Sequence, residues 1–211
     1  FIFDMGPSWY WMPEVFETFF NDFDKNISDY YNLERLNPSY KFFLKNSEIN
    51  ISANYDELLN EFEKIEKGSK TKLRSFLKSA NIKYDISMKK FIHFPNLSIR
   101  EYISISVLRY FLKLNLFQSL RNHIRSFFSS KTLRTFLEFP SMFLGGSPNN
   151  TPALYSMMNY ADIKGGTWYP IGGMYKISES FTRLSSELGV KHIVNDEIVD
   201  FKIKNDRIVN V

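Results

Sequence analysis

The chain of 211 residues is 44% hydrophobic and 24% charged, which is enough material for one large domain or two small ones with a sizeable core. Its net charge of +4 is mild and spread out, so it does not favour a nucleic-acid partner, although a weak preference for anionic membrane surfaces stays open. The absence of cysteine excludes disulfides and thiolate metal sites from this stretch, and neither a signal peptide nor an apolar run of about 18 residues is present.

The first predicted elements are a strand end, a turn and a helix. Residues 3–7 read as a strand that enters a Gly-Pro turn, and Trp9, Tyr10 and Trp11 follow it as a bulky aromatic cluster. From Pro13 the spacing of apolar residues predicts a helix with one core-facing stripe, formed by Val15, Phe16, Phe19, Phe20 and Phe23. The high aromatic content, with 21 Phe, 12 Tyr and 3 Trp, fits either contact with a long apolar ligand or a codon bias toward Phe and Tyr.

The next segment predicts a hairpin and then a series of helices. Residues 40–52 contain two β-prone pieces, and Asn54 with Glu57 forms a capping box that starts a helix. Gly68 breaks that helix and Ser69 begins another, while residues 98–101 form a second capping box after a break at Pro95. The residues expected to face the core are Tyr55, Leu58, Leu59, Phe62, Ile65, Leu73, Phe76, Leu77 and Ala80.

The most apolar predicted helix covers residues 107–128. Arg109, Lys113, Arg121 and Arg125 interrupt it, so it is either a buried helix with snorkelling cations or a helix at a membrane surface. A short helix over residues 131–139 and a turn-rich loop over residues 143–150 follow. The run of helices from 53 to 139 lies between two β-containing segments, which indicates a mainly helical domain inserted into a β-containing one.

Residues 151–188 carry the strongest motif. Thr151 as N-cap and Pro152 at the first helical position predict a helix that ends near Gly165 and Gly166, and residues 167–169 then predict a strand. A tight Gly172-Gly173 turn leads into a helix that ends at Gly189, with Met174, Ile177, Phe181, Leu184 and Leu188 on one face. A strand, a glycine turn and a helix N-terminus suit an anion or the polar edge of a flat cofactor, or they form an ordinary turn. Beyond Gly189, residues 190–194, 197–203 and 207–211 read as strands, with a turn at Asn205-Asp206.

Side chains that could do chemistry are scarce. His93, His123 and His192 lie in different elements without metal-ligand spacing, so we predict no metal site and interpret each as a surface or satisfied histidine. Asp162 is the one acid within the strongest motif, and the plain interpretation is a surface carboxylate at a helix end. The sequence therefore assigns no catalytic residue, which stays unknown.

Three long strings stand out in the chain: FDMGPSWYWMP at residues 3–13, TPALYSMMNYAD at 151–162 and GTWYPIGGMYKI at 166–177. In sequence and in order they resemble the carotenoid (phytoene) desaturase family, whose members are FAD-dependent enzymes of the amine-oxidase-like flavoprotein group. The resemblance implies an α+β or α/β fold in which part of a Rossmann-like FAD-binding domain carries an inserted, mainly helical substrate domain. The expected division is residues 1–39 in the FAD-binding domain, 40–145 in the helical domain, and 146–211 back in the FAD-binding domain with C-terminal strands.

One departure from the family is clear. The G-x-G-x-x-G turn that grips the FAD pyrophosphate does not occur, the chain opens without Met, and the family continues past residue 211. We therefore expect an internal fragment of a longer enzyme, which by itself neither holds FAD nor turns over.

The resemblance also implies which residues form the site. The expected cofactor-binding residues are Asp4, Gly6, Pro7, Gly172, Gly173, Met174 and Ile198, the last through its backbone at the adenine end of FAD. The expected substrate-lining residues are Trp9, Tyr10, Tyr155, Met158, Trp168 and Tyr169. An apolar tunnel is the expected means of recognition, because a hydrocarbon offers few polar groups to a protein.

The implied reaction removes a hydride from an allylic carbon to the flavin and a proton from the neighbouring carbon, which converts phytoene toward lycopene. Another polyprenoid, such as dehydrosqualene or a hydroxylated carotene, is the enzymatic alternative, and a non-enzymatic lipid-binding helical module is the alternative from a different class. The implied partners are a long apolar polyprenoid, a membrane surface, and an electron acceptor such as a quinone or oxygen, in a cytoplasmic protein that associates peripherally with membranes.

Overall fold

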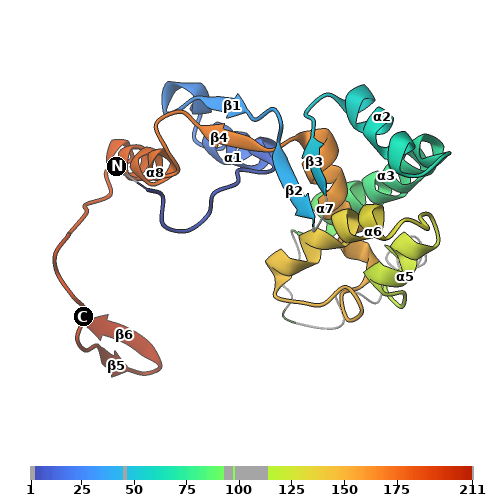
Figure 1. The fold of residues 1–211 in the computed structure, drawn as a ribbon. Coiled ribbons are helices and arrows are strands. Elements are labelled where there is room, and N and C mark those ends of the chain that lie inside the picture. The colour runs from blue at the N-terminus through green and yellow to red at the C-terminus, as the bar shows by residue number, and fades with distance from the viewer. Residues whose placement is uncertain (1–2, 45–46, 93–96, 98–113, 211) are drawn as a thin grey trace.

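The computed structural model describes residues 3–44, 47–92, 97 and 114–210 (Figure 1). Its helices are α1 Pro13–Asn21, α2 Tyr55–Ile65, α3 Ser69–Ile86, α5 Leu120–Arg125, α6 Lys131–Glu138, α7 Met157–Tyr160 and α8 Tyr175–Glu187. Short 3₁₀ or π turns are η1 Ile27–Asp29, η2 Ser87–Phe91, η4 Phe139–Leu144, η5 Ala153–Ser156 and η6 Ala161–Gly165. The strands are β1 Leu33–Arg35, β2 Tyr40–Leu44, β3 Ser47–Ile51, β4 Trp168–Pro170, β5 Lys202–Lys204 and β6 Arg207–Asn210. His93, the break at Pro95 and the capping box at 98–101 lie outside the described residues.

The described strands form three separate antiparallel pairs. β1 pairs with β4, β2 with β3, and β5 with β6. Together with the helices this is an α+β arrangement. Within the described residues no parallel pair occurs, so the Rossmann-like part of the expected fold stays a prediction.

Helices surround the larger of two apolar cores (Figure 1). α2, α3, α5 and α6 contribute most of this core, and the β2–β3 hairpin contributes Ile51. Its buried members are Ile51, Leu58, Leu59, Phe62, Leu73, Phe76, Leu77, Leu120, Ile124, Phe128, Leu133, Phe136, Leu137 and Ile163. The predicted inward positions of α2 and α3 are thus confirmed, with Tyr55 and Ile65 partly buried at the margin.

A smaller core joins residues far apart in sequence. Tyr10, Phe20, Tyr31 and Leu184 are buried together where α1, α8 and the β1–β4 pair meet. The predicted stripe of α1 is only partly right: Phe20 is buried, but Val15, Phe19 and Phe23 are each more than a third exposed. The side chains of the larger core come from between residues 40 and 163. Those of the smaller core come from between residues 10 and 33 and between residues 168 and 184. The exact domain boundaries stay a prediction.

The cap of α2 forms differently from the predicted capping box. The Asn54 side chain accepts hydrogen bonds from the backbone N–H groups of Asp56 and Glu57, as expected for an N-cap. The return bond goes through Ser52, whose hydroxyl donates to Glu57 at 2.7 Å and accepts from the Asn54 N–H at 3.0 Å. The Ser52 hydroxyl thus stands between the Glu57 carboxylate and the Asn54 N–H, which a capping box would join directly.

Two predicted helix boundaries are wrong. The helix expected over 107–128 does not run through the described part, because Asn115 adopts φ 52° and Ser119 caps a new helix, α5. The helix expected from Pro152 begins at Ala153 as a 3₁₀ turn, and the Thr151 hydroxyl donates to the Ser147 carbonyl instead of capping it. A β-bridge between Ser119 and Pro152 explains both differences, because it holds these two segments extended.

The C-terminal prediction is half right. Asn205 and Asp206 form the predicted turn with positive φ, and β5 and β6 flank it. Residues 190–201 contain no strand, although strands were expected over 190–194 and from 197. This segment reaches away from α8 as an extended connection (Figure 1), and within the described residues it finds no strand to pair with.

In the part of the chain that the structure describes, none of the helices is both long and apolar enough to cross a bilayer.

Candidate functional site

The turn at residues 4–7 lies against the turn that precedes α8. An oxygen of the Asp4 carboxylate accepts a hydrogen bond from the Met174 N–H at 3.1 Å, and the Tyr169 hydroxyl donates to the same oxygen. These hydrogen bonds hold the pKa of Asp4 below its usual value, with the Tyr169 bond as the largest cause. The structure therefore brings together two turns that are separated by most of the chain.

Gly172 and Gly173 make this approach possible. Their φ angles are +95° and +100°, in a region that side chains rarely adopt. A Cβ atom on Gly173 would lie 3.3 Å from a carboxylate oxygen of Asp4. Because Asp4 already holds the Met174 N–H near the start of α8, this helix N-terminus is occupied by the chain's own carboxylate and does not suit a phosphate.

A cavity of about 490 Å³ opens beside the first turn. Its lining residues are Gly6, Pro7, Ser8, Trp9, Trp11, Phe143 and Met158. Trp9 and Trp11 each make an edge-to-face contact with Phe143, with ring centroids 5.4 Å apart in both pairs. The cavity wall is therefore mostly aromatic and apolar, with the Ser8 hydroxyl among its few polar groups.

A buried carboxyl lies one layer behind these rings. Asp162 is 4% exposed and receives hydrogen bonds from the Tyr40 hydroxyl at 2.5 Å and the Thr167 hydroxyl at 3.0 Å. Burial raises the pKa of Asp162 to about 6, and the two hydroxyl bonds oppose that shift. The surface interpretation of Asp162 is wrong, because β2 and residue 167 cover it.

The other expected site residues lie in different places. Met158 lines the cavity with Trp9, whereas Tyr10 is 2% exposed and bonds to the Tyr31 hydroxyl at 2.6 Å in the smaller core. The indole N–H of Trp168 donates to the Gly165 carbonyl, and Tyr155 is half-buried in η5. Ile198 is 66% exposed and lines a separate hollow formed by residues 193, 196–202 and 210, which contains none of the other expected site residues.

A second buried polar cluster was missed by sequence reasoning. Lys83 is fully buried on α3, and its amine lies 3.0 Å from His123 Nε2 and 3.0 Å from the Ser156 hydroxyl. Burial lowers the pKa of Lys83 to about 8 and that of His123 to about 4. His123 is thus a satisfied buried histidine, and the described residues hold no group of three or more potential metal ligands.

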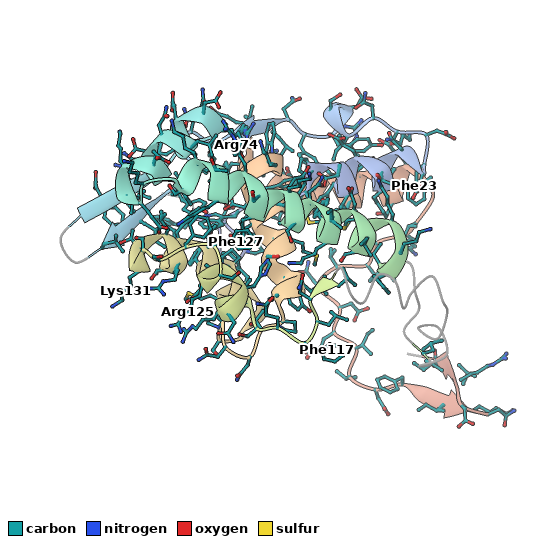
Figure 2. All side chains as sticks on the ribbon, turned by 90° about the vertical axis from the view of Figure 1, so that its right-hand side faces the viewer. Phe23, Arg74, Phe117, Arg125, Phe127 and Lys131 are labelled. Atoms are coloured by element: carbon teal, nitrogen blue, oxygen red, sulfur yellow. The ribbon has the colours of Figure 1, made fainter. Side chains whose placement is uncertain are left out.

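A larger cavity of about 1040 Å³ is lined by residues 115–119, 122 and 149–152. It carries amides, hydroxyls and apolar groups, including Phe117, which is 99% exposed and projects from the helical part (Figure 2). Its chain neighbours at 98–113 lie outside the described residues. We therefore keep the candidate site at the smaller, aromatic cavity.

Comparison with known proteins finds relatives along nearly the whole chain. A carotenoid 3,4-desaturase of Haloarcula japonica is 35% identical over 98% of this chain and 42% of its own length. A zeta-carotene-forming phytoene desaturase of Myxococcus xanthus is 31% identical over 90% of this chain and 37% of its own length. A 4,4'-diapophytoene desaturase of Staphylococcus aureus is 28% identical over 100% of this chain and 43% of its own length. The chain spans about two fifths of these relatives, and no family model matches it.

Proposed function

The chain belongs to the carotenoid desaturase family, and from this premise we propose that the whole protein oxidises a carotenoid precursor with FAD as its cofactor. The observation that supports this proposal best is the meeting of residues 4–7 with the Gly172-Gly173 turn, beside an aromatic cavity. Two motifs that carry the family resemblance thus form one site. An apolar cavity is suited to a hydrocarbon, which is recognised by shape and burial.

The residues present fit one part of FAD. Gly6 lines the cavity, and a Cβ atom on it would meet nothing within 4 Å, so its backbone is open to the edge of a flat ring system. The phosphates do not fit at α8, because Asp4 holds the N–H of Met174 there. We therefore propose that the ring of the cofactor lies near Gly6, beside the Gly172-Gly173 turn, and that its pyrophosphate binds a part of the protein outside this chain.

In the proposed reaction, a C=C bond forms as a hydride and a proton leave neighbouring carbons of the polyprenoid, and FAD when bound supplies the acceptor for the hydride. Trp9, Trp11 and Phe143 would contact the chain of the substrate and exclude water. Phytoene is our first candidate substrate. The relatives act on differently named carotenoids, which keeps another polyprenoid, such as dehydrosqualene or a hydroxylated carotene, as the alternative.

A polyprenoid dissolves in the bilayer rather than in water. We therefore also propose that the protein is cytoplasmic and attaches peripherally to the membrane. Apolar side chains at the surface of the helical part, including Phe117, Met142 and Phe143, offer contacts for a bilayer. A quinone in that bilayer, or oxygen, would reoxidise the cofactor.

The test uses the product of the complete gene. It should purify yellow with the absorbance of bound flavin, and coexpression with a phytoene-producing pathway should give a coloured product whose identity fixes the substrate and the number of steps. A colourless protein that cannot be reconstituted with FAD would reject the flavoenzyme and leave a non-enzymatic lipid-binding module. A flavoprotein that is inactive on phytoene but active on another polyprenoid would support the alternative substrate.

A further inference from the structure

Both tryptophans of the cavity are connected to the same buried carboxylate. Trp9 stacks on Tyr40, with ring centroids 4.7 Å apart and an interplanar angle of 19°, and the Tyr40 hydroxyl donates to one oxygen of Asp162. The indole N–H of Trp11 donates to the Thr167 hydroxyl at 2.9 Å, and that hydroxyl donates to the other oxygen of Asp162. Each carboxylate oxygen therefore fixes one intermediate residue, and each intermediate fixes one ring.

The hydrogen bonds of Asp162 and Thr167 are buried, so they cannot be replaced by bonds to water. Thr167 is fully buried and Asp162 nearly so, and among the described residues Asp162 has no ion-pair partner. A buried carboxyl without an opposite charge depends on its hydrogen bonds, so both hydroxyls are held in the donor orientation. With its hydrogen donated to Asp162, the Thr167 oxygen is left as the acceptor for the Trp11 N–H.

We propose that Asp162 is a positioning residue that fixes the aromatic wall of the cavity, by holding Trp9 through Tyr40 and Trp11 through Thr167. The assignment rests on the proposed function, since it treats this cavity as the polyprenoid site. Asp162 itself does not line the cavity. Its effect is therefore on how the rings meet the substrate rather than on the reacting atoms.

The experiment compares three substitutions in the complete gene product. Asp162→Asn keeps the size but turns one acceptor into a donor, Tyr40→Phe removes one hydroxyl while keeping the ring that stacks on Trp9, and Thr167→Val removes the acceptor of Trp11. We expect Asp162→Asn to raise KM for the polyprenoid roughly 5- to 30-fold, as for the loss of one or two buried hydrogen bonds. The near-UV circular dichroism of the tryptophans should change in all three variants. Adding Tyr40→Phe or Thr167→Val to Asp162→Asn should change KM and this signal little further, because Asp162→Asn already disturbs both connections.

Glu66→Gln provides the matched control. Glu66 is also a largely buried carboxylate, and it binds Lys72 and the N–H groups of Ser129 and Ser130 inside the helical part. Its substitution should lower the melting temperature without changing KM or the tryptophan signal. The proposal is overturned if Asp162→Asn leaves the tryptophan signal and KM unchanged, or if it changes KM and stability no differently from Glu66→Gln.

The optical readout also separates this proposal from the proposed function. If the wild-type protein oxidises no polyprenoid, the circular dichroism of the variants still tests whether Asp162 positions the two rings. A changed signal would then keep the positioning role and reject only the substrate.

Discussion

Asp4 and Met174 lie 170 residues apart in sequence, yet the Met174 N–H donates to the Asp4 carboxylate at 3.1 Å. The bond places the first turn of the chain at the N-terminal end of α8, where partial positive charge favours a carboxylate. The hydrogen bond satisfies a polar group of each turn. The conformation of residues 4–7 therefore depends on the glycine turn.

Our first prediction concerns the space at Gly173. Gly173→Val should reduce flavin content and destabilise the turn, because the new Cβ would lie 3.3 Å from an Asp4 oxygen and push the carboxylate off the Met174 N–H. Both effects are measured on the complete gene product, as the ratio of flavin to protein absorbance and as the melting temperature.

Gly189→Val is the control for that substitution. Gly189 has a similar positive φ of +85°, but a Cβ there would have no neighbour within 4 Å. Both variants carry the backbone strain of about 1–2 kcal/mol for a side chain in this region, and only Gly173→Val disturbs Asp4. Equal flavin content in the two variants would argue that the turn does not contribute to the cofactor site.

A second prediction follows from the raised pKa of Asp162. The Asp162 carboxyl has a pKa of about 6 in the folded state, against an ordinary value of 3.8 in the unfolded chain. Between these two pH values the folded state therefore binds more protons than the unfolded state. Stability from this group is therefore complete below about pH 4 and is lost as the pH rises through about 6, by up to ~3 kcal/mol. Asp162→Asn removes this dependence.

The measurement is the difference in unfolding free energy between the wild type and Asp162→Asn from pH 4 to 7. The difference cancels the titration of His123, whose lowered pKa makes stability change in the opposite direction over part of this window. A difference that stays constant with pH would show that Asp162 is ionised throughout, with Tyr40 and Thr167 stabilising its charge.

The elements with local signals were predictable from sequence. The Tyr40–Ile51 hairpin, the Asn54 cap and the Gly68 break depend on residues within a few positions of one another, and the structure confirms all three. The start of η5 and the interruption before α5 were not predictable. They depend on a bridge between Ser119 and Pro152, which no short window of sequence contains.

The same reasoning separates the parts of the candidate site. The family resemblance of the three motifs pointed to the two turns and to Trp9 and Met158. In the structure the two turns lie against each other, and Trp9 and Met158 line the cavity beside the first turn. The burial of Asp162 was missed, because its cover comes from Tyr40, which is 122 residues away in sequence. Lys83 was also missed, although helical spacing puts it on the same face of α3 as Phe76 and Ala80. A lysine in line with an apolar stripe was the signal that could have found it, and α5 and η5 enclose it in the structure.

A third prediction concerns that buried lysine. Among the described residues Lys83 has no carboxylate partner, and its pKa is lowered from 10.5 to about 8 by burial. Below about pH 8 the folded state carries the full penalty of a buried ammonium, roughly 3 kcal/mol, and between about 8 and 10.5 stability rises with pH because the unfolded state binds more protons. Lys83→Met, which keeps the length of the side chain, removes this slope.

Denaturant unfolding at pH 7 and at pH 10 checks the prediction. The stability of Lys83→Met relative to wild type should be more favourable at pH 7 than at pH 10, even though the substitution also removes hydrogen bonds to His123 and Ser156. Serine at position 156 keeps its own bond to the Ala153 carbonyl, so it is not left without a partner. A relative stability that does not change between pH 7 and pH 10 would mean that burial does not lower the pKa of the amine, which then stays charged in the folded state over this range.

The last prediction tests the proposed membrane contact. The complete gene product should float with liposomes, and Phe117→Glu should weaken this association by about 10-fold or more, because it replaces an apolar ring worth roughly 1.5–3 kcal/mol on burial with a charge. Phe117 is 99% exposed, so the substitution removes little packing from the fold. Phe43→Glu is the control, since Phe43 is also exposed, at 77%, but lies on the β2–β3 hairpin. Equal flotation of the wild type and both variants would place the membrane contact elsewhere, and equal loss in both variants would mean that general hydrophobicity, rather than the surface around Phe117, carries the association.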